Sequence, residues 1–185
     1  VQDLRYLNDN RVLDLLIELL GDSEEEVWSE AIDTLVYFKS VESFEKAFCS
    51  NNKEIRRNAL YGFIQLKEEE PLIKALGDNS YEIRSCAAKG LGELMSLKAI
   101  KPLVEVLKDN HWLVREATVK AIGDIFDLKR NEKLMRMRKR KIRALRNKLF
   151  LPILDSFYDE EHWVRYSASR ALGKLGDRRA IEHLH

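Results

Sequence analysis

The chain has 185 residues, of which 34% are charged and 45% are hydrophobic, a composition typical of a soluble globular domain or a short repeat array. No apolar run approaches the roughly 18 residues that indicate a membrane-spanning helix, and the first residues lack the pattern of a signal peptide. The two cysteines, Cys49 and Cys86, are too few for a disulfide framework. We therefore expect a reducing, cytoplasmic location and inert, packed thiols.

Both ends of the chain are predicted to be incomplete repeats. Residues 4–13 match residues 172–181 in their order of hydrophobic and polar side chains. We therefore expect partial repeats at residues 1–10 and 179–185, with residues 1–8 as the end of a second helix and Ala180 to His185 as the start of a first helix. The array would then be truncated at both ends.

One sequence frame recurs between these ends. It is clearest at Asp109 to Ile125, DNHWLVREATVKAIGDI, where an aspartate precedes a hydrophobic residue and an arginine by five and six places. The same frame begins at Asp78 and Asp159, and weaker copies begin at Asp22 and Ser50. Self-similarity at such a period indicates a stacked array. We predict repeats at residues 11–39, 40–67, 68–97, 98–128 and 149–178.

Each repeat is predicted to be a pair of helices. In the fourth repeat, Ile100, Leu103 and Leu107 have helical spacing, and Pro102 fits the first turn of the first helix. The second helix of each repeat carries alanine and glycine at its middle positions, which lets neighbouring helices approach closely. Because one pair is too small to bury its own apolar stripe, the pairs must stack on one another.

A branched apolar residue marks the beginning of each second helix. Successive members of this set are 28, 28, 31 and 50 residues apart: Val27, Ile55, Ile83, Val114 and Val164. The first three intervals fit one helix pair each. The last interval is longer by about 19 residues, which indicates an insertion between the fourth and fifth repeats.

An arginine follows four of these five positions, as Arg56, Arg84, Arg115 and Arg165, whereas Trp28 takes its place in the first complete repeat. One interpretation is a ladder of anion-binding side chains. The interpretation that we favour is structural: each arginine reaches the turn aspartate of its own or the next repeat, such as Asp78, Asp109 or Asp159. Such pairs would cap helices and fix the stacking.

The pattern P-L-x-x-x-L-x-D-x(4)-V-R-x-x-A-x-x-A-L-G resembles the HEAT-like repeats of the phycobilisome-lyase type, which are related to HEAT and armadillo arrays. The residues that carry it in the fourth repeat are Pro102, Leu103, Leu107, Asp109, Val114, Arg115, Ala121 and Gly123. The resemblance implies an all-α fold, an α-solenoid (a right-handed α–α superhelix) of about five HEAT-like helix pairs. It implies little about function, because the family includes scaffolds, lyases, hydroxylases and glycosylases.

The resemblance also implies that the second helices line a concave face. The exposed positions of these helices that we predict to contact a partner are Asp33, Tyr37, Arg57, Tyr61, Lys89, Glu93, Lys120, Tyr166 and Arg170. This set mixes both charge signs with tyrosines, which suits a protein ligand better than a polyphosphate. A merely solvated face is the alternative.

Three large aromatic residues, Tyr81, Trp112 and Trp163, lie in or just after the turn between the helices of their repeats. We interpret them as packing groups between repeats. Stacking on a base or caging of an aromatic ligand is the alternative.

Residues 129–148, which we call the basic segment, are the predicted insertion. They contain 11 of the 32 lysines and arginines and one of the 31 acidic residues, a local net charge of +10, so the remainder has a net charge of −9. Asn131 is a plausible N-cap, and nothing from Glu132 to Phe150 breaks a helix. The side chains that we predict to bind anions are Arg136, Arg138, Lys139, Arg140, Lys141 and Arg143.

Four interpretations of the basic segment remain open. It folds onto the acidic remainder of its own array or of a neighbouring copy, or it binds an acidic protein, nucleic acid or an anionic membrane surface. The segment has no aromatic residues for base stacking, so nucleic-acid binding would rest on phosphates and fall steeply with salt.

Catalytic signatures are scarce. The HEAT-repeat deoxyhypusine hydroxylases hold iron with His-Glu pairs, and no histidine here is followed by glutamate. No residue specific to the lyases can be matched either. We therefore predict a non-enzymatic protein-binding scaffold with no metal, cofactor or small-molecule substrate, and with the basic segment as a second, electrostatic contact. The alternatives are a nucleic-acid-binding module and a lyase-type enzyme or enzyme subunit.

Overall fold

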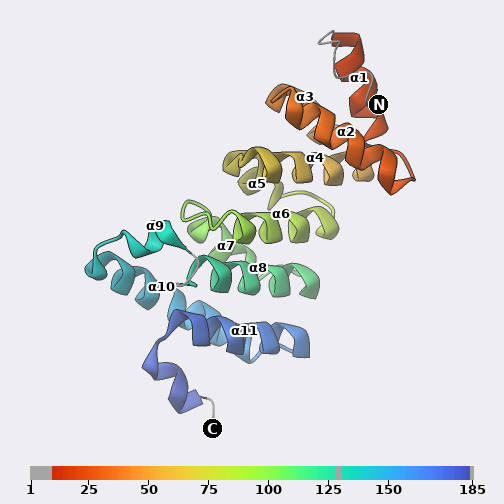
Figure 1. Ribbon diagram of the computed structural model, residues 1–185. Coiled ribbons are helices and arrows are strands. Elements are labelled where there is room, and N and C mark those ends of the chain that lie inside the picture. Colours follow the sequence, from red (N-terminus) through yellow and green to blue (C-terminus); the bar gives the residue numbers. More distant parts are fainter. Residues whose placement is uncertain (1–9, 128–130, 184–185) are drawn as a thin grey trace. The chain divides into compact units, whose positions relative to one another are not determined.

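The computed structural model describes residues 10–127 and 131–183, and all regular elements within them are helices (Figure 1). The predicted partial repeat at residues 1–10 therefore lies outside the described residues except for Asn10. The helices are α1 Asn10–Leu19, α2 Glu25–Tyr37, α3 Val41–Phe48, α4 Lys53–Leu66, α5 Glu69–Ala75, α6 Tyr81–Glu93, α7 Ile100–Val106, α8 Trp112–Ile125, α9 Glu132–Met135, α10 Lys139–Phe157, α11 His162–Leu175 and the 3-10 helix η2 Arg178–His183.

The helices occur as successive pairs, which are α1/α2, α3/α4, α5/α6, α7/α8 and α10/α11. A short turn joins the two helices of each pair, and in the first four pairs the first helix is shorter than the second. This arrangement confirms the prediction of an all-α array of about five helix pairs. None of the helices in the described ranges is long and apolar enough to cross a membrane.

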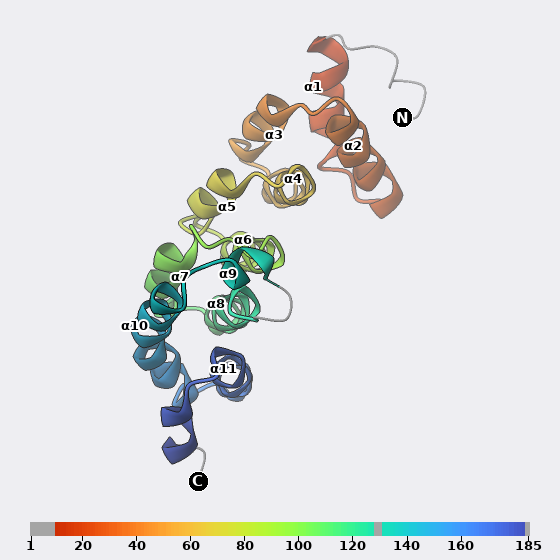
Figure 2. The same ribbon diagram turned by 60° about the vertical axis from the view of Figure 1, so that its left-hand side comes forward.

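The chain divides into two compact units, residues 1–90 and residues 91–185, with the boundary inside α6. In the first unit α2 packs against α1 and α4, and α3 packs against α1 and α4. In the second unit α8 packs against α7 and α11, and α10 packs against α11. Within each unit the second helices lie side by side, α2 with α4 and α8 with α11 (Figure 2).

The core of the first unit is built around two phenylalanine rings. Phe44 and Phe63 are fully buried, with ring centroids 5.9 Å apart. A buried polar contact joins two repeats, since the side-chain amide of Asn58 donates to the carbonyl of Leu20 at 2.8 Å. Asn58 is thus buried without leaving this donor unsatisfied, as burial requires.

Small residues allow the second helices of the second unit to approach one another closely. A Cβ placed on Gly123 would lie 3.1 Å from the Cα of Ala171, and one placed on Gly92 would lie 2.8 Å from the Cα of Ala121. Both distances end on backbone atoms, which cannot rotate away. The prediction that glycine and alanine bring neighbouring helices together is therefore confirmed for these helices.

The turn aspartates of the repeat frame hold the turns by local hydrogen bonds. Asp78, Asp109 and Asp159 each accept the backbone N–H of the residue two places later, at 2.8, 2.8 and 2.9 Å. A short acidic side chain that bonds its own backbone in this way favours a turn over continued helix. This contact explains why the frame begins with aspartate.

The basic segment differs from its prediction in one respect. Asn131 caps α9 as expected, because its side chain accepts the N–H of Leu134 at 3.1 Å. The single helix predicted from Glu132 onward is wrong, since α9 ends at Met135 and the backbone of Arg138 is extended before α10 begins. Because of this break, α9 can bury Leu134 while α10 begins as a separate helix that continues into the fifth repeat.

The second half of the basic segment is continuous with the first helix of the fifth repeat. α10 therefore extends well before Pro152, which corresponds in the repeat frame to Pro102 near the beginning of α7. Pro152 has no N–H to donate to the carbonyl four residues earlier, so the helical hydrogen bonding is interrupted there.

Candidate binding surfaces

The recurring arginines occupy equivalent positions and bind backbone carbonyls of their own turns. One terminal nitrogen of each donates to the carbonyls of the residues six and five places earlier. The distances to these two carbonyls are 2.9 and 3.2 Å for Arg56, 2.8 and 3.1 Å for Arg84, 3.0 and 3.4 Å for Arg115, and 2.8 and 2.7 Å for Arg165. The remaining nitrogens of Arg56 and Arg115 bind a carboxylate.

Arg56 and Arg115 also bind the turn aspartate of the next repeat. Arg56 Nε lies 3.1 Å from Asp78 Oδ2, and Arg115 Nε lies 2.7 Å from Asp159 Oδ2. Both pairs are bidentate and largely buried, with 11% and 12% of the side-chain surface exposed for Arg115 and Asp159. The structural interpretation of the arginines is therefore confirmed for these two, because their donors are already bound to the protein.

The ion pair changes the pKa of both partners. Burial alone would raise the pKa of Asp159, but the hydrogen bonds from Arg115 and from the N–H of Glu161 more than offset it, so the pKa is lowered. The hydrogen bond to Asp159 raises the pKa of Arg115. Both groups are therefore charged at neutral pH, and the pair acts as a fixed clamp between repeats rather than as a titrating site.

The exposed residues of α8 and α11 form the first candidate surface, which we call the α8/α11 surface. They surround a hollow of about 170 Å³, and its lining includes three of the predicted residues, Lys120, Tyr166 and Arg170. The other lining residues are Glu116, Gly123, Asp124, Trp163, Ser167, Ala171 and Lys174. The structure thus brings together the predicted contact residues of the fourth and fifth repeats.

The acidic residues of the α8/α11 surface are already engaged. Asp124 accepts from Lys174 at 2.5 Å, and Glu116 accepts from the hydroxyl of Ser167 at 2.9 Å. Lys120 is exposed and forms no ion pair with any other residue in the described ranges. The lining therefore has three cations, Lys120, Arg170 and Lys174, against two carboxylates, which leaves an excess of one positive charge.

Two aromatic rings stand beside these cations. Trp163 and Tyr166 are 52% and 55% exposed, and their rings meet edge to face with centroids 6.4 Å apart. The guanidinium of Arg170 lies over the Tyr166 ring, 5.8 Å from its centroid, within the range of a cation–π contact. The interpretation of Trp163 as a packing group is wrong, because more than half of the side chain is open to solvent.

In the first unit the corresponding face lies on α2 and α4. The ring of Tyr61 stacks on Trp28 of the neighbouring repeat, with centroids 6.0 Å apart. Trp28 stands where the other repeats have an arginine, and it contacts the next repeat by ring stacking. Arg57 pairs with Glu54 at 2.7 Å, and Gln65 donates to Asp33 at 3.4 Å. Tyr37 takes no part in these contacts and is exposed.

The last two predicted contact residues, Lys89 and Glu93, are exposed on α6. They belong to different units, Lys89 to the first and Glu93 to the second. Their role in binding stays a prediction.

The six cations predicted to bind anions are all exposed, and the structure does not gather them into one site. Arg136 pairs with Glu132 of its own helix at 3.2 Å, with both side chains at least 80% exposed. Arg138, Arg140 and Lys141 form no ion pair among residues 10–127 and 131–183. At these three positions no ion pair within those ranges supports the interpretation in which the basic segment folds onto acidic residues of its own array, and that interpretation stays a prediction.

Lys139 and Arg143, two of the six, line a cavity. With Met135, Met137, Ile142, Arg146, Asn147, Gly176, Asp177, Arg178 and Arg179 they enclose a cleft of about 940 Å³, which we call the cationic cleft. Its walls are α9, the first half of α10 and the turn from α11 into η2. Sequence reasoning missed Arg146, Arg178 and Arg179, although Arg146 lies in the basic segment.

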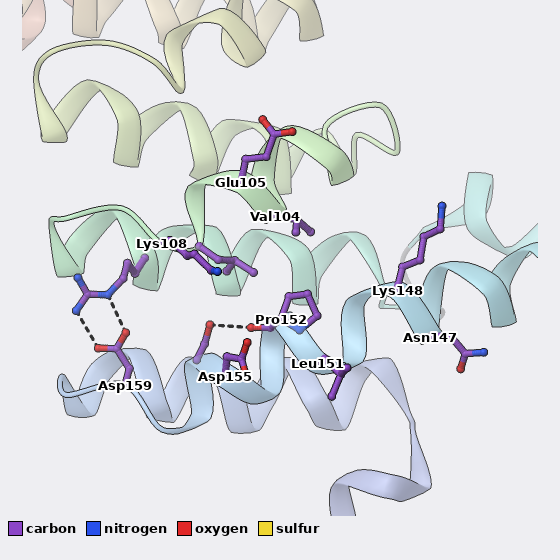
Figure 3. A pocket seen from close by; sticks show the side chains of 12 residues that line it. Val104, Glu105, Lys108, Asn147, Lys148, Leu151, Pro152, Asp155 and Asp159 are labelled. Carbon is purple, nitrogen blue, oxygen red and sulfur yellow. Dashed lines mark hydrogen bonds and ion pairs between the residues drawn. The ribbon is translucent and has the colours of Figure 1, made fainter.

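A third hollow lies between the first helices α7 and α10, with a volume of about 870 Å³ (Figure 3). Val104 and Glu105 line it from α7, and Leu151 and Pro152 line it from α10. Its charges are mixed, because Glu105, Asp155 and Asp159 are offset by Lys108, Lys148 and Arg115. Sequence reasoning gave no sign of this groove, which depends on how α10 meets α7.

Other chemistry finds little support in the described part of the chain. No three His, Cys, Asp or Glu side chains within it are grouped as metal ligands would be. Cys49 and Cys86 are both free thiols, and Cys49 is exposed, so its interpretation as a packed thiol is wrong. His111 accepts the N–H of Leu113 at 3.3 Å as the N-cap of α8.

Stacked helix pairs, repeated arginine clamps and exposed second helices define an α-helical repeat protein. The family profile described as HEAT repeats matches residues 41–123 and 69–147, which together span more than half of the sequence. The profile described as PBS lyase HEAT-like repeat matches residues 164–185. The chain belongs to the HEAT-repeat family.

Solved structures agree with this fold. The complex of CpcE and CpcF of phycocyanin lyase from Nostoc sp. PCC7120 is similar at a TM-score of 0.66 and 19% identity, covering 89% of this chain and 99% of the other. A designed armadillo repeat protein in complex with the peptide (KR)4 is similar at a TM-score of 0.57 and 19% identity, covering 94% and 86%. Comparison with curated proteins gives no match.

Proposed function

We propose that this chain is a non-enzymatic scaffold that binds a segment of a partner protein on the α8/α11 surface. The observation that carries the proposal is the meeting of Trp163, Tyr166 and Lys120 around one hollow. Exposed aromatic rings beside basic side chains are typical anchors of protein interfaces. A segment with an apolar or aromatic side chain and a carboxylate would satisfy both kinds of group.

The similar structures support a protein as the class of ligand. One is a designed repeat protein with a bound peptide, and another is a complex of the two proteins CpcE and CpcF. The free cysteines favour the cytoplasm as the place where the scaffold works.

Selection from a random peptide library displayed on phage tests the proposal. We expect enriched peptides to contain an aromatic or large apolar residue near a carboxylate. Their affinity should fall about tenfold or more in Tyr166→Ala and in Lys120→Glu, as for anchors at an interface. The matched control is Lys101→Ala, an exposed lysine on α7 outside this surface, which should leave affinity unchanged. Peptides that bind all three variants alike would contradict the proposed site.

Phosphate-backbone binding of nucleic acid is the alternative, and the exposed cations Arg138, Arg140 and Lys141 favour it. A salt titration with mixed-sequence duplex and single strands tests it, because phosphate binding weakens steeply as salt rises. Binding that is lost in Arg140→Glu/Lys141→Glu would support this function. If the chain binds no nucleic acid at low salt, this alternative function is excluded.

An enzymatic role of the lyase kind is supported only by the likeness to the phycocyanin lyase complex. At 19% identity this likeness extends to the fold, and the described residues suggest no catalytic group. A purified chain that carries a visible absorbance band after incubation with a bilin would favour this role over a scaffold.

A further inference from the structure

We propose that the cationic cleft is a second binding site that takes an acidic, amphipathic helix of a partner protein. This inference goes beyond the α8/α11 surface, because it uses different residues and a different ligand class. It rests on the charge of the cleft, on the apolar residues among its cations and on the fixed geometry of its walls.

The charge of the lining is strongly one-sided. Lys139, Arg143, Arg146, Arg178 and Arg179 face the cleft together with a single carboxylate, that of Asp177. Asp177 is fully engaged, since Arg179 contacts both of its oxygens at 2.9 and 2.5 Å. The hydrogen bond from Arg179 lowers the pKa of Asp177, so protonation does not free either partner at neutral pH. Four cations remain for an occupant.

One of these cations has an unsatisfied donor. The Nε atom of Arg146 is enclosed and makes no hydrogen bond within the described part of the chain. The Nε atom itself is covered by protein atoms, so a carboxylate would reach this guanidinium through its other nitrogens. A cationic side chain in the lining whose Nε has no partner favours an anionic occupant.

The walls of the cleft are held together before anything binds. Arg179 donates to Asn147 of α10 at 3.1 Å, while its guanidinium lies over the ring of Phe150, 4.1 Å from the centroid. The same side chain holds Asp177 in the turn after α11. Arg179 therefore joins the two walls, so less ordering is needed on binding.

Apolar side chains decide the class of the occupant. Met135, Met137 and Ile142 line the cleft, and Met135 is 61% exposed. Methionine side chains adapt to different apolar partners and are common where amphipathic helices dock. Phosphates would leave these groups without a partner, and the cleft lining has no aromatic ring for base stacking. An acidic peptide with an apolar face matches both the cations and the apolar side chains of the lining.

The length of the cleft limits the occupant. Lys139 to Asn147 on α10 spans about 12 Å at 1.5 Å per residue, which corresponds to roughly two helical turns. Two turns present two or three carboxylates and a similar number of apolar side chains on adjoining faces.

The test is fluorescence anisotropy at physiological salt with labelled peptides of about 16 residues, a length at which isolated helices become marginally stable. The probe is (Glu-Leu-Leu-Glu)4, and the comparison peptide is (Glu-Ser-Ser-Glu)4, which has the same charge and no apolar face. We expect the leucine peptide to bind about tenfold more tightly than the serine peptide. Equal affinities would overturn the proposal, because charge alone would then explain binding.

Two double variants with the same change in net charge locate the site. Lys139→Glu/Arg143→Glu reverses two cations of the cleft, and Arg140→Glu/Lys141→Glu reverses two neighbours outside its lining. All four side chains are exposed, so circular dichroism should show retained helicity in both. We expect the first variant to lose about tenfold or more in affinity and the second less than about threefold. Equal losses would contradict a defined cleft.

Two further arms separate the alternatives. Tyr166→Ala should bind the leucine peptide normally, so failure of the α8/α11 proposal would not affect this one. Mixed-sequence DNA duplex should compete poorly with the peptide at the same salt. A duplex that binds more tightly and depends on Lys139 and Arg143 would overturn the proposal in favour of nucleic acid.

Discussion

Arg115 and Asp159 are 44 residues apart in the sequence, yet their side chains meet in a bidentate ion pair with distances of 2.7 and 2.9 Å. The equivalent partners Arg56 and Asp78 are 22 residues apart. The additional residues between the fourth and fifth repeats therefore leave the repeat-to-repeat contact intact. The basic segment is an insertion between α8 and α11 that preserves the arginine–aspartate contact between these two helical repeats.

Removing one member of this pair should destabilise the second unit. Asp159→Asn leaves the largely buried Arg115 with only the exposed carboxylate of Glu160, at 3.2 Å, and we expect a loss of about 2–3 kcal/mol in the free energy of unfolding. Urea unfolding followed by tryptophan fluorescence measures it. The matched control, Glu132→Gln, breaks the exposed pair with Arg136 and should change stability by less than about 0.5 kcal/mol. Equal effects would mean that the buried clamp adds little.

The carboxyl group of Glu82 should remain ionised at unusually low pH. The Ser80 hydroxyl, at 2.5 Å, and then Lys53, at 2.9 Å, lower its pKa from 4.5 to about 2. Since the pKa is lower in the folded state, the contact stabilises the fold above about pH 4.5, and this contribution is lost as pH falls toward 2. A carbon-13 NMR titration should show the low midpoint in the wild type and a clear rise in Ser80→Ala. An unchanged midpoint would show that the hydroxyl is not the main cause.

Replacing Gly123 with alanine should loosen the contact between α8 and α11. The new Cβ would lie 3.0 Å from the Cβ and 3.1 Å from the Cα of Ala171, so the two helices must move apart. We expect a loss of about 1–3 kcal/mol in the free energy of unfolding. Gly173→Ala is the control, because nothing lies within 4 Å of its Cβ position, and it should stabilise α11 by about 0.5–1 kcal/mol. If Gly123→Ala lowers the free energy of unfolding and Gly173→Ala raises it, then packing, and not helix propensity, determines the effect at Gly123.

Asn131 should be essential for the beginning of the basic segment. Its side chain accepts from Leu134 N–H and donates to the Ile125 carbonyl at 2.7 Å, while only 1% of the residue is exposed. Asn131→Ala should lower stability by about 1–2 kcal/mol. Asn131→Asp keeps the cap acceptor and loses the donor, so an intermediate loss is expected. If both variants were as stable as the wild type in urea, neither bond would matter.

The repeat architecture could be predicted because its signals are local. The turn aspartates, the arginine six places later and the small residues of the second helices act within one repeat or between adjacent repeats. Val114 and Val164 are buried as the frame requires, whereas Val27 and Ile55 are only partly buried. Periodicity therefore identifies a helix face without fixing how deeply each member is covered.

The candidate sites could be predicted only in part. Lys120, Tyr166 and Arg170 meet as expected, since their helix positions determine the face on which they lie. The cationic cleft was not foreseen, because Arg178 and Arg179 come from a turn more than 30 residues beyond Arg143. The break after Met135 was missed because helix propensity permits a continuous helix there, and the burial of Leu134 opposes it.

Burial divides α10 into two parts of different local stability. Residues 139–148 are exposed or partly exposed, whereas the part that begins at Leu149 and Phe150 and continues past Pro152 is buried on one face. The amide hydrogens of residues 139–148 should therefore exchange with solvent sooner than those of the buried part that follows. A ligand bound in the cationic cleft should therefore slow amide hydrogen exchange between residues 142 and 151. Exchange rates in the rest of the array should stay the same.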